Sequence, residues 1–150
     1  MKKIILYVAC ILIVFSAAAA PGSKLIQRFN ETFPNAKNVK WRDEKAGHFV
    51  SFTQNGNLNK VFYNTSGNFV YSLKYSDGTE LPTNILMALN KNFGESKIIG
   101  ATEVTTQNNT VYNIKFSKEE KLYCLNILAD GTIAKQEVYD NVITNIVSDK

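Results

Sequence analysis

The sequence predicts an α+β fold in which one helix is followed by four antiparallel strands, and this unit occurs twice. Apolar residues recur first at helical spacing and then at alternate positions, the periods of an amphipathic helix and of a half-buried strand. The pattern then starts again, since Phe33 and Phe93 are 60 residues apart and the turn glycines Gly67 and Gly131 are 64 apart. Two such repeats are expected to join into one longer sheet, with both helices on one face.

The first residues have the pattern of a secretory signal peptide. Lys2 and Lys3 form a positive segment, an apolar run covers 4–15, and small residues at 16–20 offer a cleavage site. We therefore expect residues 1–19 to be removed and the domain at 20–150 to be periplasmic or secreted, without a membrane span. Two alternatives stay open: a retained membrane anchor, for which the run is short, and a lipoprotein signal ending at Cys10.

Composition excludes several classes of function. Removal of Lys2 and Lys3 leaves 15 Lys and Arg against 13 Asp and Glu, a net charge of +2. No basic run or aromatic RNA-binding motif is present, so a nucleic-acid partner is not expected. Cys124 has no partner once Cys10 leaves with the signal, so the domain must be stabilised by a packed core rather than by disulfides.

The first repeat spans about residues 23–79. Ser23 is a plausible N-cap for a helix over 24–33, and Pro34 ends that helix because the residue before a proline avoids the α region. Four strands are expected, at 35–42, 48–54, 58–65 and 68–75. Asn55-Gly56-Asn57 and the glycine-containing turn at 64–68 are typical of β-hairpins.

The second repeat spans about residues 80–139. Pro82 suits the first turn of a helix over 81–93, and Gly94 suits its C-terminal end. Strands are expected at about 97–107, 110–117, 121–128 and 132–139. The last strand breaks the alternation, which indicates an edge position or a bulge. In the tail at 141–150, apolar residues at helical spacing predict a short capping helix or a frayed end.

Four segments resemble secreted PepSY-like proteins, the β-lactamase-inhibitor-like proteins of Bacteroidetes-type bacteria. They are FPNAKNVKW (Phe33–Trp41), SGNFVYSLKY (66–75), ELPTNILMALNKNF (Glu80–Phe93) and KIIGATEV (Lys97–Val104). The resemblance covers Ser23 to about Tyr139. It implies an exported domain of two helix-plus-four-strand repeats with no enzymatic activity and no agreed ligand. It also points to enzyme inhibition, although no motif of this sequence carries that activity.

The residues offer little for catalysis. His48 is the one histidine, and it is expected at a strand edge or on the surface. A dyad of His48 with Cys124 would require the fold to bring the two repeats together. No spaced His and Cys residues suit zinc, and Asp77-Gly78 and Asp130-Gly131 lack the ligand series of a calcium loop, so both are predicted to be turns. We therefore expect no enzyme, no cofactor and no metal.

The candidate binding surface is the helix-free face of the sheet. Alternation predicts that Tyr71 and Leu73 face the first helix with the other inner residues. The opposite face would then carry ten residues: Lys40, Arg42, Phe49, Ser51, Thr53, Lys60, Phe62, Val70, Ser72 and Lys74. Phe49 and Phe62 are the expected anchors, because bare rings on a wet face are typical of interfaces, and Lys40, Arg42, Lys60 and Lys74 are the expected rim charges. The alternative is that the tail, a bulge or a register shift buries the two rings.

Together these observations predict an exported, non-enzymatic binding domain. Its partner would be a protein or peptide of the cell envelope, with an inhibited enzyme as one form of that partner. The alternative is a sensor that binds a small molecule or an envelope polymer between the repeats. A pocket lined by Trp41 and tyrosines would favour the sensor.

Overall fold

The computed structural model of the protein describes residues 21–140. The signal peptide predicted at 1–19 and the tail at 141–150 lie outside the described residues. Neither helix within 21–140 is long and apolar enough to cross a membrane.

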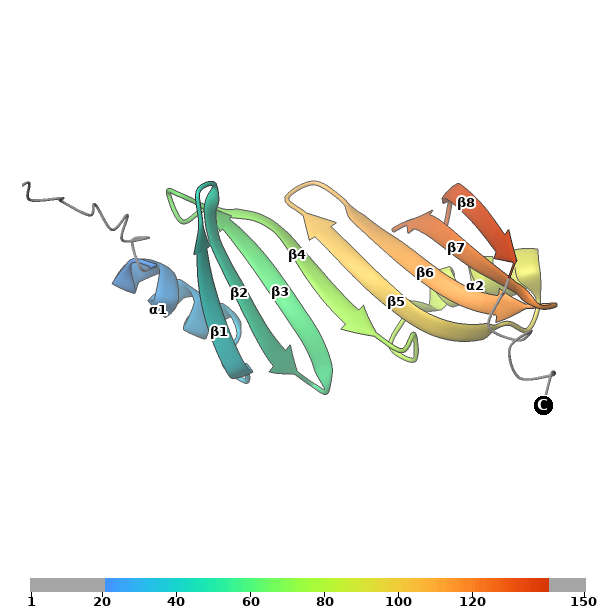
Figure 1. Ribbon diagram of the computed structural model, residues 1–150, viewed down its shortest axis with the longest axis horizontal. Coiled ribbons are helices and arrows are strands. Elements are labelled where there is room, and N and C mark those ends of the chain that lie inside the picture. The colour runs from blue at the N-terminus through green and yellow to red at the C-terminus, as the bar shows by residue number, and fades with distance from the viewer. Residues whose placement is uncertain (1–20, 141–150) are drawn as a thin grey trace, which may run out of the picture.

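The protein is built on one antiparallel sheet of eight strands in the order β1 to β8, so every strand pairs with its neighbours in sequence (Figure 1). The elements are α1 (Ser23–Thr32), β1 (Lys37–Glu44), β2 (Gly47–Gln54), β3 (Asn57–Asn64), β4 (Phe69–Ser76), α2 (Thr83–Phe93), β5 (Lys97–Thr106), β6 (Thr110–Lys118), β7 (Lys121–Leu128) and β8 (Ile133–Asp140). The predicted α+β class and the antiparallel sheet are confirmed. The origin of the chain by tandem duplication stays a prediction.

Each helix covers its own part of the sheet with a separate core. Leu25 and Phe29 of α1 pack on β2 and β3, where the Phe29 and Phe52 rings meet edge to face at 5.1 Å. Ile85 and Leu89 of α2 pack on β6 and β7 in a second cluster that shares no buried residue with the first. We call α1 to β4 the N-terminal half and α2 to β8 the C-terminal half.

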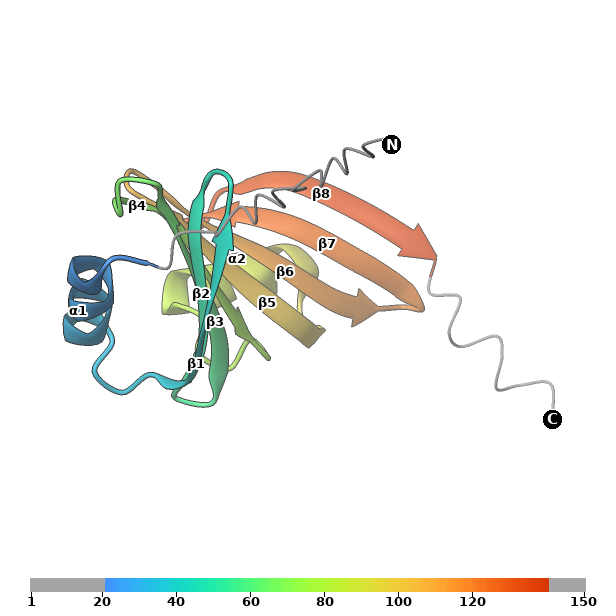
Figure 2. The same ribbon diagram turned by 60° about the vertical axis from the view of Figure 1, so that its left-hand side comes forward.

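Both helices lie on the same face of the sheet. Cross-strand partners share a face, and the register links Val61 of the first core to Ser72, and Ser72 to Thr105. Ala101 lies on the same side of β5 as Thr105 and belongs to the second core. The sheet twists strongly between the halves, so that β1 to β3 are seen nearly edge-on in Figure 2 while β5 to β8 fan out.

A bulge in β4 changes which residues face α1. Phe62 pairs with Tyr71 but Tyr63 pairs with Phe69, so Val70 is an extra residue in the ladder. Phe69 therefore packs against the first core, while Tyr71 lies on the opposite face beside Phe62.

Two predictions for β4 are wrong for this reason. Tyr71 and Leu73 were expected to face α1, and they lie on the helix-free face. Lys74 was expected on the helix-free face, but it alternates with Leu73 and so lies on the helix side. Ser72 moves to the helix side in the same way.

The same irregularity occurs in β8. Asn126 pairs with Lys135 but Ile127 pairs with Ile133, which leaves Ala134 as the extra residue. Ile133 packs against the second core, and Lys135 continues on the helix-free face with Glu137. The bulge proposed for the broken alternation of the last strand is confirmed. The outer strand β1 is also irregular, between Lys37 and Lys40, where Asn38 has a φ of 55°.

The halves are joined by the pairing of β4 with β5 and by the short linker before α2. In that linker Asp77 accepts hydrogen bonds from the backbone N–H of Thr79 (2.9 Å) and from its hydroxyl (2.7 Å). Gly78 has a φ of +93°, and a Cβ there would lie 2.6 Å from Cγ2 of Ile98. Asp77-Gly78 is thus a turn, as predicted, and it packs closely on β5.

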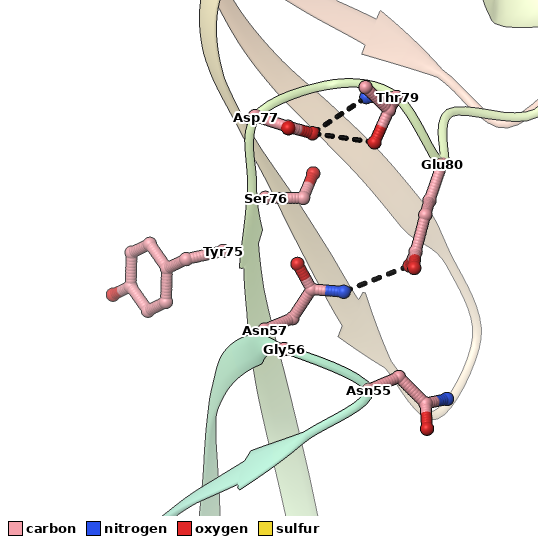
Figure 3. A pocket seen from close by; sticks show the side chains of 8 residues that line it. All are labelled: Asn55, Gly56, Asn57, Tyr75, Ser76, Asp77, Thr79 and Glu80. Atoms are coloured by element: carbon pink, nitrogen blue, oxygen red, sulfur yellow. Dashed lines mark hydrogen bonds between the residues drawn. The ribbon is translucent and has the colours of Figure 1, made fainter.

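Glu80 ties this linker back to the N-terminal half. Its Oε2 accepts hydrogen bonds from Nδ2 of Asn57 at 2.9 Å (Figure 3) and from Nζ of Lys74 at 2.6 Å. The lysine is the larger cause of a lowered Glu80 pKa. Lys74 is therefore engaged in an ion pair within the chain.

Because the two cores share no residue, mutations in them should act independently. We expect Leu25→Ala and Ile85→Ala each to lower the free energy of unfolding by about 2–5 kcal/mol, since both side chains are buried. The double variant should equal the sum of the two within about 0.5 kcal/mol. Denaturant unfolding measures all three values. A larger deviation would show that the cores are energetically coupled.

The Lys74–Glu80 pair predicts a pH dependence that can be followed at a single carboxyl. Lys74→Gln should raise the Glu80 pKa toward its ordinary value, as measured by an NMR pH titration. A lowered folded-state pKa stabilises the protein above the unfolded-state pKa, and this contribution is lost as the pH falls through the folded-state value. Lys60→Gln, on the opposite face, is the control and should leave Glu80 unchanged. An unchanged pKa in Lys74→Gln would contradict the assigned cause.

Candidate functional site

The helix-free side of the sheet, which we call the open face, carries two neighbouring rows of side chains in the N-terminal half. Each row runs across β1 to β4 through directly paired residues. The aromatic row consists of Arg42, Phe49, Phe62 and Tyr71, and the lysine row consists of Lys40, Ser51, Lys60 and Leu73. Five of the six predicted site residues belong to these rows, and Lys74 is the exception.

The aromatic row is a continuous series of neighbouring rings that are tilted relative to one another. The ring centroids of Phe49 and Phe62 are 4.6 Å apart, and those of Phe62 and Tyr71 are 5.5 Å apart. The guanidinium of Arg42 lies 5.4 Å from the centre of the Phe49 ring and donates to Glu44 at 2.7 Å. Cation–π and aromatic contacts of this kind hold side chains in fixed positions.

The rings are half-buried by one another rather than by a covering element. Both helices of residues 21–140 lie on the other face, and neither core cluster includes Phe49 or Phe62. Within the described part of the chain, the alternative that a bulge or register shift buries the two rings is therefore wrong. The bulge in β4 instead adds Tyr71 to them. The tail lies outside the described residues, so its part in that alternative stays open.

The lysine row differs from the aromatic row in its charge. Lys40 is exposed and Lys60 is partly buried, with its Nζ 5.3 Å from the centre of the Tyr75 ring. Among residues 21–140, neither lysine forms an ion pair. Ser51, between them in the row, has its hydroxyl 3.5 Å from the carbonyl oxygen of Lys40, which is too long for a strong hydrogen bond.

A hollow of about 430 Å³ lies between and around the two rows. Its lining residues are Lys40, Trp41, Arg42, Phe49, Val50, Ser51, Lys60, Tyr71 and Leu73. The Trp41 ring itself packs in the first core, 5.4 Å from the Phe29 ring and 6.1 Å from the Tyr63 ring. The hollow is therefore mainly a cationic and aromatic surface.

The C-terminal half has different residues at the same positions of its sheet. When β5 to β8 are compared in order with β1 to β4, the row that corresponds to the aromatic row consists of Thr102, Asn113, Asn126 and Lys135. The row that corresponds to the lysine row consists of Gly100, Lys115, Cys124 and Glu137. Lys135 donates to Glu137 at 2.7 Å, which raises the lysine pKa and lowers the glutamate pKa. Similar strands thus form without the aromatic stack, and the stack is not a requirement of the fold.

Residues considered for catalysis lie apart. His48 faces the helix side of the N-terminal half, where its Nδ1 is 2.6 Å from Oδ1 of Asp43. Cys124 is on the open face of the C-terminal half, opposite Lys115 and Glu137. The structure therefore does not bring His48 and Cys124 together. Residues 21–140 contain no cluster of three or more His, Cys, Asp or Glu suited to a metal ion.

Two further hollows border the junction of the halves. One, of about 460 Å³, lies by the linker and is lined by polar residues that include Asn55, Asn57, Asp77 and Glu80 (Figure 3). The carboxylates of Asp77 and Glu80 already accept hydrogen bonds within the chain. The other, of about 320 Å³, is lined by Asn64, Phe69, Val70, Thr106, Gln107 and Asn108. Neither is lined by Trp41.

Comparison with known proteins identifies solved structures with a similar fold. Neither protein-family models nor curated proteins match the sequence. Among solved structures, a DUF2874 family protein from Bacteroides ovatus has a TM-score of 0.63 at 19% identity, over 80% of this chain and 89% of its own. A BLIP-like protein from Bacteroides fragilis has a TM-score of 0.63 at 17% identity, over 82% of this chain and 90% of its own.

A third structure, from Bacteroides eggerthii, is described as that of a proposed periplasmic protein. It has a TM-score of 0.63 at 16% identity, over 85% of this chain and 96% of its own. Identities this low establish a common fold rather than a common function. The chain therefore has the fold seen in DUF2874 and BLIP-like proteins of Bacteroides.

Proposed function

We propose that the protein is an exported, non-enzymatic binding domain that recognises a protein or peptide of the cell envelope through the open face of its N-terminal half. The observation that supports this proposal most is the aromatic row. Three neighbouring rings and an arginine lie on a face that no described element covers. The corresponding positions of the C-terminal half hold Thr102, Asn113, Asn126 and Lys135.

Such a surface suits protein recognition. Aromatic and arginine side chains are enriched among the residues that dominate interface energies, because they bury a large area with few rotatable bonds. Phe49 and Phe62 serve as the anchors, and Tyr71 extends them. Lys40 and Lys60 lie along one side of the rings and Arg42 lies at the outer end of the row, and these charges orient the partner.

The structural relatives support the location and the class of function. One is described as a proposed periplasmic protein, which agrees with the signal peptide predicted at 1–19, and another is described as BLIP-like. Inhibition of an envelope enzyme is accordingly the form of binding that we propose to test first. We also propose that the protein is a member of the PepSY-like family that its sequence resembles.

A small-molecule or polymer sensor is the second candidate. It is favoured by the volume of the hollow on the open face, about 430 Å³, which falls in the usual range of ligand pockets. This hollow lies within the N-terminal half rather than between the halves.

The proposal predicts that binding depends on the aromatic row. Phe49→Ala/Phe62→Ala should lose an envelope partner that the wild type captures, since interface anchors each contribute about 2 kcal/mol or more. The measurement is quantitative affinity capture from an envelope extract, with circular dichroism to confirm that each variant is folded.

Asn113→Ala/Asn126→Ala is the matched control, because these residues occupy the same positions on the open face of the C-terminal half. It should capture the same partner as the wild type. Equal capture by the phenylalanine variant would refute the assignment, and loss in the control alone would move the site to the C-terminal half.

A further inference from the structure

We infer that the open face binds an extended segment of a partner protein carrying an acidic residue two positions from a large apolar residue, the acid on the lysine row and the apolar side chain on the aromatic row. This inference rests on the proposed function and specifies the chemistry of its partner. It follows from the spacing of the two rows, from their charge and from the apolar residues that continue the lysine row beyond Lys60.

The spacing of the rows matches an extended chain. Neighbouring rows are two residues apart along each strand, as Lys60 and Phe62 are on β3. Two residues of a strand span about 6.7 Å. Side chains at positions i and i+2 of an extended partner that runs along the strands are separated by the same distance and point to the same side. Such a partner places one side chain on each row.

The lysine row supplies the site for the acid. Lys40 and Lys60 flank Ser51 from the neighbouring strands, so their Cα atoms are about 10 Å apart, two strand spacings. A carboxylate above Ser51 can therefore accept from the hydroxyl and from Lys40. It can also accept from Lys60 after a rotation of that side chain, whose Nζ lies 5.3 Å from the centre of the Tyr75 ring. No carboxylate of residues 21–140 pairs with these lysines, and the Ser51 hydroxyl has only a long contact.

The aromatic row supplies the apolar half of the site. Phe49, Phe62 and Tyr71 present adjoining ring surfaces, and Leu73 continues this apolar character beside Lys60. Arg42, at the outer end of the row, already forms an ion pair with Glu44, whereas Lys40 and Lys60 form none within residues 21–140. The acid is thus assigned to the lysines rather than to the arginine.

The extent of positive charge favours a short acidic segment over a polyanion. Beyond Lys60 the lysine row continues through Leu73, Val104, Val111 and Leu128, which are all apolar. In the C-terminal half Lys135 is paired with Glu137. Lys115, which forms no ion pair within residues 21–140, lies in a different row, between Gly100 and Cys124. A polymer with many charges would meet no further unpaired lysine along this row, whereas one carboxylate followed by apolar contacts fits it.

The test uses a displayed library of random 12-residue peptides, selected on the wild-type protein. The enriched peptides should share Asp or Glu two positions from an aromatic or large aliphatic residue. Synthetic peptides from the selection, measured by fluorescence anisotropy, should bind Lys40→Gln/Lys60→Gln at least about tenfold more weakly, the loss of one hydrogen bond between charged groups. The salt dependence of binding should decrease in that variant.

Lys115→Gln/Lys135→Gln is the matched control, since it removes the same charge from the open face of the C-terminal half. It should bind the peptides like the wild type. Peptides without acidic residues that lose affinity in Phe49→Ala/Phe62→Ala but not in Lys40→Gln/Lys60→Gln would overturn the acidic motif and leave the proposed function standing. Enrichment of nothing, or of peptides indifferent to both variants, would overturn this inference, whereas the proposed function is decided separately by the capture experiment with Phe49→Ala/Phe62→Ala.

Discussion

The pairing of β4 with β5 is the interaction on which the rest of the structure depends. The two cores share no buried residue, so this ladder and the linker at 77–82 join them. Because antiparallel partners share a face, the ladder also places both helices on one side, and no helix of residues 21–140 covers the other side of the eight strands. A single run of backbone hydrogen bonds thus sets the arrangement of cores and of open face together.

Within that arrangement, the bulge at Val70 decides the composition of the open face. An unbroken β4 would turn Tyr71 and Leu73 toward α1 and would place Lys74 on the open face, opposite Leu58. The extra residue, Val70, puts Tyr71 and Leu73 on the open face and Lys74 on the helix side. The tyrosine then completes the ring stack, and the lysine instead holds Glu80 of the linker. The same local device therefore contributes to the candidate site and to the join between the halves.

Most of the fold could be predicted from the sequence because its elements have strong periods and clear turn residues. The helices, the eight strands and the faces of β1 to β3 follow from alternation and from Asn-Gly and Asp-Gly turns. The faces of β4 could not be predicted, because a bulge adds a residue without changing the local composition. The one available signal was in β8, where Lys135 and Glu137 occupied positions that alternation assigned to the core. Tyr71 and Leu73 occupy the corresponding positions of β4, so the mismatch in β8 indicates that these two residues also lie on the open face.

For the candidate site, Phe49, Phe62, Lys40, Arg42 and Lys60 could be placed from the sequence, whereas their partners could not. Pairing across strands, such as Lys40 with Ser51 and Ser51 with Lys60, depends on the register that each turn sets, and alternation within one strand does not give that register.

The two outermost strands, β1 and β8, form the edges of the sheet. An open sheet exposes two edges to which other chains can add, and native proteins blunt such edges with bulges and lysines. Here β1 and β8 are both irregular and carry exposed lysines, Lys37 and Lys135. Irregular edges that carry lysines disfavour the addition of a further strand, so they limit edge-to-edge association of the sheet.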